Sequence, residues 1–154
     1  MPKILSHSPA ETKKLAKKLA KKLKPPLVLA LTGDLGSGKT TFIQGFARGL
    51  GIKKKILSPT FIIFRKFEIR NSKSETNSKF KIKNSKFQFL YHIDCYRIQK
   101  PQELLNLGFK KIISEPQNIV LIEWAEKIKK ILPKKTIWLK FNYGLKENER
   151  IITY

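Results

Sequence analysis

One glycine-rich stretch combines residue types and spacing that suit the binding of a phosphate group. Residues 33–40 read Gly-Asp-Leu-Gly-Ser-Gly-Lys-Thr and fit the pattern G-x-x-x-x-G-K-[ST] of a phosphate-binding loop, the P-loop. Glycine lets the backbone turn with its N–H groups pointing inward, where a side chain would obstruct a phosphate. We expect the nucleotide-binding residues to be Gly33, Asp34, Leu35, Gly36, Ser37, Gly38, Lys39, Thr40 and Thr41.

Two side chains of this loop suit a nucleotide and its metal ion. Lys39 is positioned to neutralise charge on the β- and γ-phosphates. The Thr40 hydroxyl is a hard oxygen ligand of the kind that Mg²⁺ prefers. A glycine-rich turn without a function would leave the Gly-Lys-Thr triplet unexplained, so we predict a true phosphate site.

A carboxylate for the metal ion is expected at the end of residues 118–122, an apolar run that predicts a buried strand. Glu123 follows this run directly, which puts an acid at the carboxyl end of a central strand, where open α/β sheets bind ligands. We expect Thr40 and Glu123 to hold Mg²⁺. Trp124 comes next, and it is expected either to cover the site or to pack against its neighbours.

Residues 87–97 carry a second group of polar side chains. On a strand, His92, Asp94 and Tyr96 would share one face, with Ile93 and Cys95 facing inward. Three polar residues on one face near a strand end suggest a site, whereas a solvent-facing row at a sheet edge is the alternative.

A P-loop requires a strand before it and a helix after it, and the sequence predicts both. Residues 27–31 are apolar, residues 42–50 have apolar side chains at helical spacing, and Gly51 suits a helix end. The helix would place its positive dipole end at the anion. Upstream, residues 8–11 predict an N-cap serine and a capping box, opening a helix that runs to about Leu23.

The remaining segments complete an α/β pattern. Residues 61–67 and 87–94 predict strands. A short helix is expected to begin near Pro101 and to break at Gly108, and residues 109–115 continue as a short helix or turn. Residues 125–132 predict another helix. Residues 136–143 and 149–154 alternate and predict a closing antiparallel pair. The predicted fold is α/β: a P-loop NTPase-like three-layer domain of residues 1–154 with a mostly parallel central sheet and antiparallel additions.

Two parts of the chain admit more than one interpretation. Thr60, in a Ser-Pro-Thr-Phe turn, suits an ordinary turn residue or a second hydroxyl near the phosphates. Residues 68–87 contain Asn-Ser-Lys three times and have too little apolar area to pack. We interpret them as a long hairpin tip or a partly disordered insertion, with an RNA-binding arm as the alternative.

The composition restricts the class of protein. With 41% hydrophobic residues in 154, the chain can bury a core, and no apolar run is long enough to predict a membrane span. There is no signal-peptide pattern, and a single cysteine excludes an internal disulfide, so cytoplasm is the expected compartment. The net charge of +22 indicates a phosphate-rich partner such as RNA, an acidic protein surface, or a compositional bias, since 28 of the 33 basic residues are lysine.

Taken together, the motifs resemble the bacterial TsaE family, the P-loop ATPases of tRNA threonylcarbamoyladenosine biosynthesis. The resemblance runs nearly end to end, and beyond the P-loop it rests on motifs of this family. They are Ser-Pro-Thr-Phe at 58–61, His-Ile-Asp-Cys-Tyr-Arg at 92–97, Pro-Gln-Glu-Leu at 101–104, Gly108 and Leu-Ile-Glu-Trp at 121–124. Ser37 stands where the family usually has alanine, and neither the insertion at 68–87 nor the strong positive charge is a family feature.

The resemblance implies an ATP- and Mg²⁺-dependent ATPase that supports tRNA modification together with TsaD and TsaB, and that contacts tRNA indirectly or through its basic surface. Asp94 would orient the attacking water, Thr41 would contact the α-phosphate and Thr60 would sense the γ-phosphate. Arg97 would act either as an arginine finger or in a structural salt bridge. His92, Tyr96 and Trp124 would join a switch or partner-sensing region. Hydrolysis would be slow until a partner completes the site.

Two other classes of function fit parts of the sequence. A small-molecule kinase shares the P-loop, but such kinases usually carry an arginine-rich lid, and Arg97 is the only arginine between the insertion and Glu123. A basic RNA-binding module switched by nucleotide fits the charge. A GTPase is disfavoured because the chain has no Asn-Lys-x-Asp motif.

Overall fold

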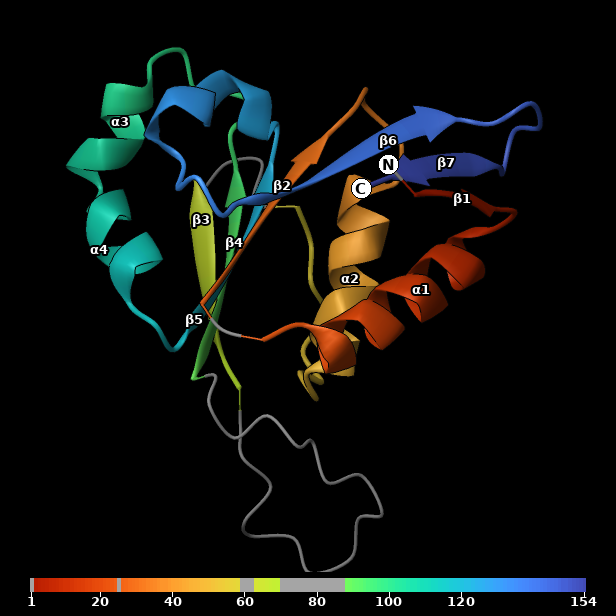
Figure 1. Cartoon of the computed structure of the whole chain (residues 1–154), viewed down its shortest axis with the longest axis horizontal. Helices are drawn as coiled ribbons and strands as arrows, with labels where there is room; N and C mark the ends of the chain where they lie inside the picture. Colours follow the sequence, from red (N-terminus) through yellow and green to blue (C-terminus); the bar gives the residue numbers. More distant parts are fainter. Residues whose placement is uncertain (1, 25, 59–62, 70–87) are drawn as a thin grey trace, which may run out of the picture.

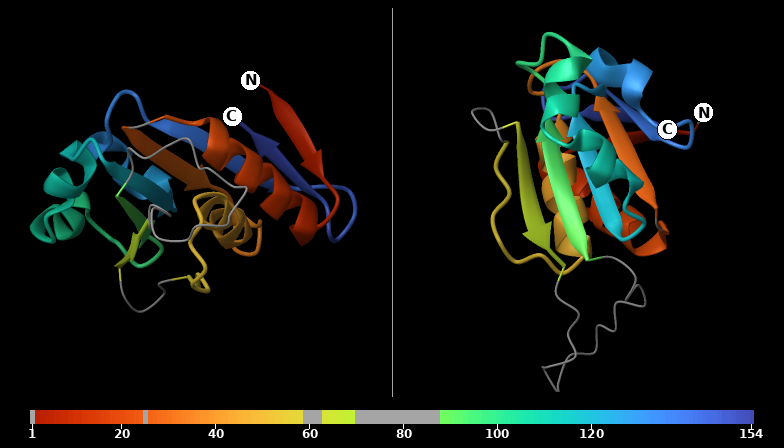
Figure 2. Two further views of the ribbon diagram at one scale, coloured as in Figure 1. Left: turned by 90° about the horizontal axis from the view of Figure 1, so that it is seen from below. Right: turned by 90° about the vertical axis from the view of Figure 1, so that its left-hand side faces the viewer.

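A seven-stranded sheet forms the middle layer of the molecule (Figure 1, Figure 2). The computed structural model describes residues 2–24, 26–58, 63–69 and 88–154. The strand order is β1-β7-β6-β2-β5-β4-β3. The strands are β1 (Lys3–Ser6), β2 (Leu27–Thr32), β3 (Phe64–Glu68), β4 (Phe89–Asp94), β5 (Asn118–Glu123), β6 (Ile137–Tyr143) and β7 (Arg150–Thr153).

Helices cover both faces of this sheet, and each face has its own apolar core. One face packs against α1 (Pro9–Lys22) and α2 (Lys39–Gly49). The other packs against α3 (Pro101–Asn106), α4 (Phe109–Ser114) and the 3₁₀ helix η1 (Ala125–Ile131). The structure therefore confirms the predicted three-layer α/β fold.

The central strands are parallel, and the outer strands are added antiparallel. β2 pairs in parallel with β5 and β6, and β4 pairs in parallel with β5. β1, β7 and β3 join through antiparallel pairs, as predicted for the closing pair at the C-terminus. The register aligns Glu123 with both Leu31 and Asp94, so the ends of three strands meet beside the P-loop.

Both ends of α2 follow the local rules that the sequence indicates. Gly38 is the N-cap, and Gly51 lies beyond the C-cap with a φ of 81°. The N–H groups of Gly51 and Ile52 donate to the carbonyls of Arg48 and Ala47, the pattern of a Schellman motif. The C-terminus of α2 is therefore set locally, by Gly51 and the hydrogen bonds of this motif.

Several sequence-based expectations need correction. The strand β1 was not predicted. It has four residues and one buried side chain, which is too short a segment to show a periodic pattern. Its extended conformation comes from pairing with β7. The helix predicted for residues 125–132 is present as a 3₁₀ helix of residues 125–131 with a kink at Ile128. The Ser8 side chain caps α1, but the Glu11 carboxylate accepts from the N–H of His7 and does not close the predicted capping box.

The strand predicted at 61–67 is β3, Phe64–Glu68; residues 61 and 62 lie outside the described part. β3 and β4 are antiparallel neighbours, and Ile69, inside the expected insertion, is buried in the core. Residues 70–87 also lie outside the described part, so the insertion of 68–87 stays a prediction. In the described part of the chain, no helix is both long and apolar enough to cross a membrane.

Candidate functional site

The P-loop joins β2 to α2 and has glycine where the backbone requires it. The φ angles of Gly33, Gly36 and Gly38 are 133°, 73° and 99°, in the region that favours glycine. A Cβ atom on Gly33 would lie 2.3 Å from the carbonyl oxygen of Phe141, so β6 excludes a side chain there. Since Gly38 has no side chain to cap α2, the first N–H groups of this helix are available to an anion.

The Lys39 ammonium lies inside the loop. Its Nζ donates to the carbonyl oxygens of Gly33 at 2.6 Å and Asp34 at 2.8 Å, and the side chain is almost fully buried. The Trp124 ring centroid lies 4.2 Å from the same nitrogen, within the range of a cation–π contact. The lysine is thus held at the centre of the loop by backbone oxygens and one aromatic face.

Burial lowers the pKa of the Lys39 ammonium, because desolvation disfavours its charged form. Nearby carboxylates oppose this shift, in the order Glu123, Glu126, Asp94 and Asp34. A single buried cation is therefore surrounded by acidic groups from several elements, which is the electrostatic setting of a phosphate and metal site.

Glu123 is the acidic residue closest to the P-loop threonine. Thr40 Oγ1 donates to Glu123 Oε1 at 2.9 Å and Oε2 at 3.0 Å. On the other side, His92 Nε2 lies 2.8 Å from Glu123 Oε1. Because a carboxylate only accepts, Nε2 is the donor of this hydrogen bond, and the buried Nδ1 has no partner among the described residues.

Asp94 is fixed by two donors. Ser58 Oγ donates to Oδ2 at 2.6 Å, and the N–H of Tyr96 donates to Oδ1 at 2.9 Å. The carboxyl group is nearly buried and comes from β4, directly beside Glu123 on β5. The sequence therefore predicted correctly that these acids meet, but it gave no reason to choose Ser58 as a partner of Asp94.

Trp124 follows β5 in a left-handed conformation, with φ 57° and ψ 38°, which is uncommon for a residue other than glycine. The turn brings its ring over Lys39 and 5.1 Å from the ring of Tyr96. Trp124 therefore packs against Tyr96 and Lys39, while covering of a bound nucleotide stays a prediction.

The polar face expected for 92–96 is wrong in two respects. His92 and Asp94 do share a face, but it is buried, and Leu90 on the same face belongs to the core that includes α2. Tyr96 lies in the turn after the strand and is about half exposed. Arg97 is exposed in the same turn, and Thr60 lies outside the described residues, so the functions predicted for both stay untested.

The other predicted loop residues differ in exposure. Leu35 is exposed, Ser37 is fully buried with its Oγ 3.5 Å from Lys39 Nζ, and Thr41 is half-buried in the first turn of α2. All of them lie in the loop or at the start of the helix, as predicted.

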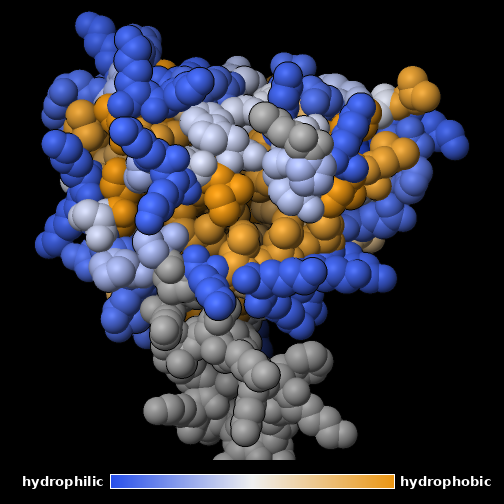
Figure 3. All heavy atoms as spheres, viewed as in Figure 1, coloured by the Kyte–Doolittle hydropathy of each residue, from blue (hydrophilic) through white to orange (hydrophobic). Residues whose placement is uncertain are grey.

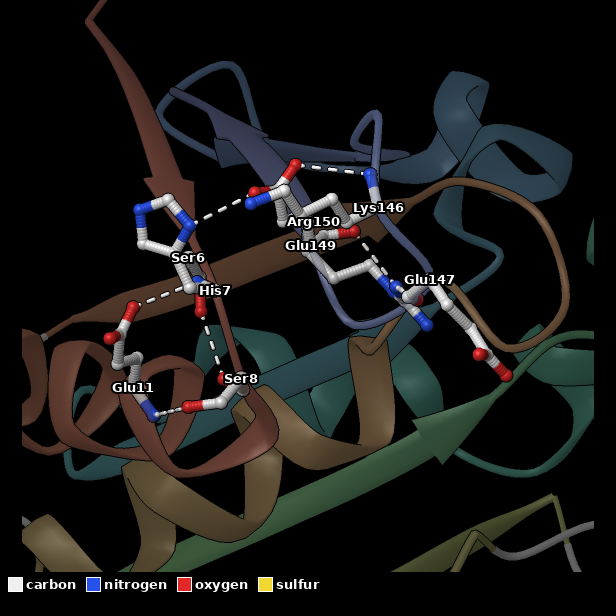
Figure 4. Close-up of polar contacts among 8 residues, drawn as sticks. All are labelled: Ser6, His7, Ser8, Glu11, Lys146, Glu147, Glu149 and Arg150. Carbon is white, nitrogen blue, oxygen red and sulfur yellow. Dashed lines mark hydrogen bonds and ion pairs between the residues drawn. The ribbon is translucent and has the colours of Figure 1, made fainter.

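Two residues from the C-terminal strands hold the loop from outside, and the sequence alone did not identify them. The Tyr143 hydroxyl donates to the carbonyl of Leu35, and Arg150 Nη2 donates to the carbonyl of Gly36 at 3.1 Å. Figure 4 shows that Arg150 belongs to a wider network, in which Glu149 contacts His7 at 3.1 Å. In the sequence, Tyr143 and Arg150 look like ordinary positions of alternating strands.

The donors at this site suit Mg²⁺. Thr40 and Glu123 supply a hydroxyl and a carboxylate within hydrogen-bond distance of each other, and both are hard oxygen ligands. No group of three His, Cys, Asp or Glu side chains forms a metal cage in the described part of the chain. Mg²⁺ commonly takes one or two protein ligands plus phosphate and water, so two ligands are sufficient here.

Comparison with known proteins identifies the family. The model of the family "Threonylcarbamoyl adenosine biosynthesis protein TsaE" matches residues 6–152. The chain belongs to the TsaE family. The TsaE protein of Bacillus subtilis is 37% identical over 96% of this chain and 80% of its own length. The TsaE protein of Rickettsia felis is 36% identical over 96% of this chain and 76% of its own length.

A solved structure supports the same assignment. The crystal structure of YdiB from Bacillus subtilis superposes with a TM-score of 0.71 and 32% identity, covering 98% of this chain and 82% of that one. The resemblance predicted from the motifs is therefore confirmed. Membership of the TsaE family makes this chain a nucleotide-binding P-loop protein of threonylcarbamoyladenosine biosynthesis.

Proposed function

We propose that this TsaE protein is a Mg²⁺-dependent ATPase that works with TsaD and TsaB in the modification of tRNA in the cytoplasm. One arrangement carries the proposal: Thr40 of the P-loop is hydrogen-bonded to Glu123 at the end of β5, and Asp94 lies beside Glu123 at the end of β4. A P-loop that only bound a phosphate would not need two buried acids at its open edge.

Phosphate binding would rest mainly on the backbone. The N–H groups of residues 34–40 and the positive end of α2 would bind the β- and γ-phosphates, and Thr41, in the first turn of α2, would contact the α-phosphate. Lys39, now bonded to the carbonyls of Gly33 and Asp34, would neutralise phosphate charge. Burial lowers the pKa of Lys39, and the acids around it oppose that shift.

Thr40 and Glu123 would hold the Mg²⁺, Glu123 directly or through water. When bound, this ion would stabilise the negative charge that develops during phosphoryl transfer. His92 helps to fix the orientation of the Glu123 carboxylate, since its Nε2 donates to Oε1, the oxygen that Thr40 also contacts.

Asp94 would orient the attacking water, and its two donors support this role. Ser58 Oγ and the N–H of Tyr96 each donate a hydrogen bond to one carboxylate oxygen, and together they fix the plane of the carboxylate. Phosphoryl transfer depends on positioning and charge stabilisation more than on covalent chemistry, so these few groups are sufficient. Thr60 and Arg97, which follow Ser58 and Asp94 closely in sequence, would respond to the γ-phosphate.

Replacing the P-loop lysine tests whether ATP binds here. In Lys39→Ala, we expect ATP affinity to fall by on the order of 100-fold, because charge-assisted hydrogen bonds to phosphate are lost. Calorimetry with Mg–ATP measures the change. Lys140→Ala, an exposed lysine of β6, is the matched control and should bind as the wild type does. Equal affinity in all three proteins would exclude the P-loop as the ATP site.

A further inference from the structure

The outward half of α1 is covered by lysine. Thr12, Ala16 and Ala20 are buried, and the leucines beside them are partly buried. The exposed lysines of this helix repeat with helical spacing, and we call them the α1 lysine surface. Its members are Lys13, Lys14, Lys17, Lys18, Lys21 and Lys22.

A second group of lysines extends this surface. Gly49, near the end of α2, approaches α1 so closely that a Cβ atom would lie 2.7 Å from that of Ala20 and 2.8 Å from the carbonyl oxygen of Lys17. Ile52 is then buried in the same core, and the exposed residues 53–55, all lysine, follow it. Figure 3 shows the band of hydrophilic side chains along α1, beside the apolar side chains between α1 and the sheet.

Acidic residues do not balance this charge. Between Glu11 and Glu68 the sequence contains one acid, Asp34, and it belongs to the P-loop. Within the described part of the chain, no ion pair is found for Lys13, Lys14, Lys17, Lys18 or Lys22. Like charges four residues apart on a helix repel each other, so the arrangement costs stability in the free protein. A bound polyanion would remove that repulsion.

We propose that the α1 lysine surface binds the phosphate backbone of RNA. Protein–protein interfaces are enriched in aromatic residues and arginine and depleted in lysine, and the α1 lysine surface has lysine alone. Lysine acts as a mobile point charge that contacts phosphates without reading bases. The six lysines span about 14 Å of helix axis, which is long enough to face several phosphates in a row.

The surface is separate from the nucleotide site. Lys39 is buried in the loop at the start of α2, whereas the α1 lysine surface points away from the sheet. The inference rests on the proposed function only for the identity of the RNA, which would be the tRNA that is modified. It adds a direct contact between this protein and that tRNA, independent of TsaD and TsaB.

Neutralising matched sets of lysines tests the inference. The variant Lys14→Gln/Lys18→Gln/Lys22→Gln removes three charges from the α1 lysine surface. The control Lys110→Gln/Lys130→Gln/Lys134→Gln removes three exposed charges from the opposite face. Binding of an unmodified tRNA transcript would be measured by fluorescence anisotropy at several salt concentrations. Circular dichroism would verify that both variants are folded.

For the α1 variant, we expect affinity to fall by on the order of tenfold, and the slope of log K against log salt to decrease by about 2 to 3. The control should change affinity by less than about twofold. An equal loss in both variants, or a loss in neither, would show that binding follows net charge or lies elsewhere, and would overturn the inference.

Two further measurements separate the alternatives. Displacement of tRNA by polyglutamate at equal charge concentration would assign the surface to an acidic protein instead of RNA. ATP hydrolysis should be unchanged in the α1 variant, because none of its substitutions touches the P-loop. Loss of tRNA binding with intact hydrolysis supports the inference, whereas intact tRNA binding with intact hydrolysis overturns it and leaves the proposed ATPase function standing.

Discussion

Glu123 is the residue on which the geometry of the site converges. It is only 3% exposed, and its carboxylate accepts from Thr40 and from His92. A buried carboxylate is costly unless its oxygens are hydrogen-bonded, and both partners here are side chains from other elements. Its neighbour Asp94 is held in the same way by Ser58 and a backbone N–H.

Asp94 is expected to act in hydrolysis and not in binding. In Asp94→Asn, we predict that ATP affinity stays within a few-fold of the wild type while hydrolysis falls by about 10² to 10⁴, the usual contribution of a positioned base. Phosphate release under single-turnover conditions measures the step. Glu126→Gln, which removes an exposed acid near the site, is the control. Unchanged turnover in Asp94→Asn would remove Asp94 from the mechanism.

The P-loop is positioned by elements on both sides of it. α2 begins at Lys39, Thr40 in its first turn donates to Glu123 at the end of β5, and Tyr143 of β6 and Arg150 of β7 donate to carbonyls of the loop. Arg150 contributes a hydrogen bond to Gly36, and its guanidinium carbon lies 4.7 Å from the ring centroid of Tyr143. The C-terminal strands are thus part of the nucleotide site, although they carry none of its motifs.

Removing the Arg150 brace should weaken ATP binding without abolishing it. One neutral-acceptor hydrogen bond contributes about 0.5 to 1.5 kcal/mol, so Arg150→Ala is expected to raise the Kd for ATP by roughly 3- to 10-fold. The same calorimetric titration used for Lys39 measures it, again with Lys140→Ala as control. A wild-type Kd in Arg150→Ala would mean that the loop keeps its conformation without β7.

The close approach of α1 and α2 depends on glycine. A Cβ atom on Gly45 would lie 2.4 Å from the carbonyl oxygen and 2.5 Å from the Cα of Lys13. Since these are backbone atoms, the helices must separate, and we expect Gly45→Ala to lower the free energy of unfolding by about 1 to 3 kcal/mol. Urea denaturation measures this loss. The exposed Arg48→Ala on the same helix should stay within about 0.5 kcal/mol of the wild type.

The sequence predicts the strongly periodic elements well, because their signals are local. The apolar run before the P-loop, Gly51 after α2 and the acid at the end of β5 each correspond to an observed feature. β1 escapes prediction because only its partner β7 gives it a reason to be extended. The 3₁₀ form of η1 depends on the turn at Trp124 and the kink at Ile128, which no helical pattern reveals.

Within the site, the motif residues could be predicted and their partners could not. The P-loop pattern identifies Lys39 and Thr40, and strand-end spacing identifies Asp94 and Glu123. Ser58, Tyr143 and Arg150 reach the site across distances in sequence of 36 to 114 residues, which only the tertiary fold brings together.

Across the whole molecule, charge is distributed unevenly between two regions. The acids that surround Lys39 gather at the carboxyl edge of the parallel strands, while exposed lysines of α1 cover an outer surface. Such a division suits a protein that binds a nucleotide at one region and a larger polyanion at another. Six of the lysines that contribute to the net charge of +22 therefore lie together on α1.

The most direct test is the formation of threonylcarbamoyladenosine on tRNA by TsaD and TsaB from the same organism, measured over many turnovers with this protein and Mg–ATP. We predict that the wild type sustains repeated turnover, and that Asp94→Asn, which binds ATP but does not hydrolyse it, stops it. Equal product with the wild type, the Asp94→Asn variant or no added TsaE protein would contradict the account, because hydrolysis at this P-loop would then have no part in the modification.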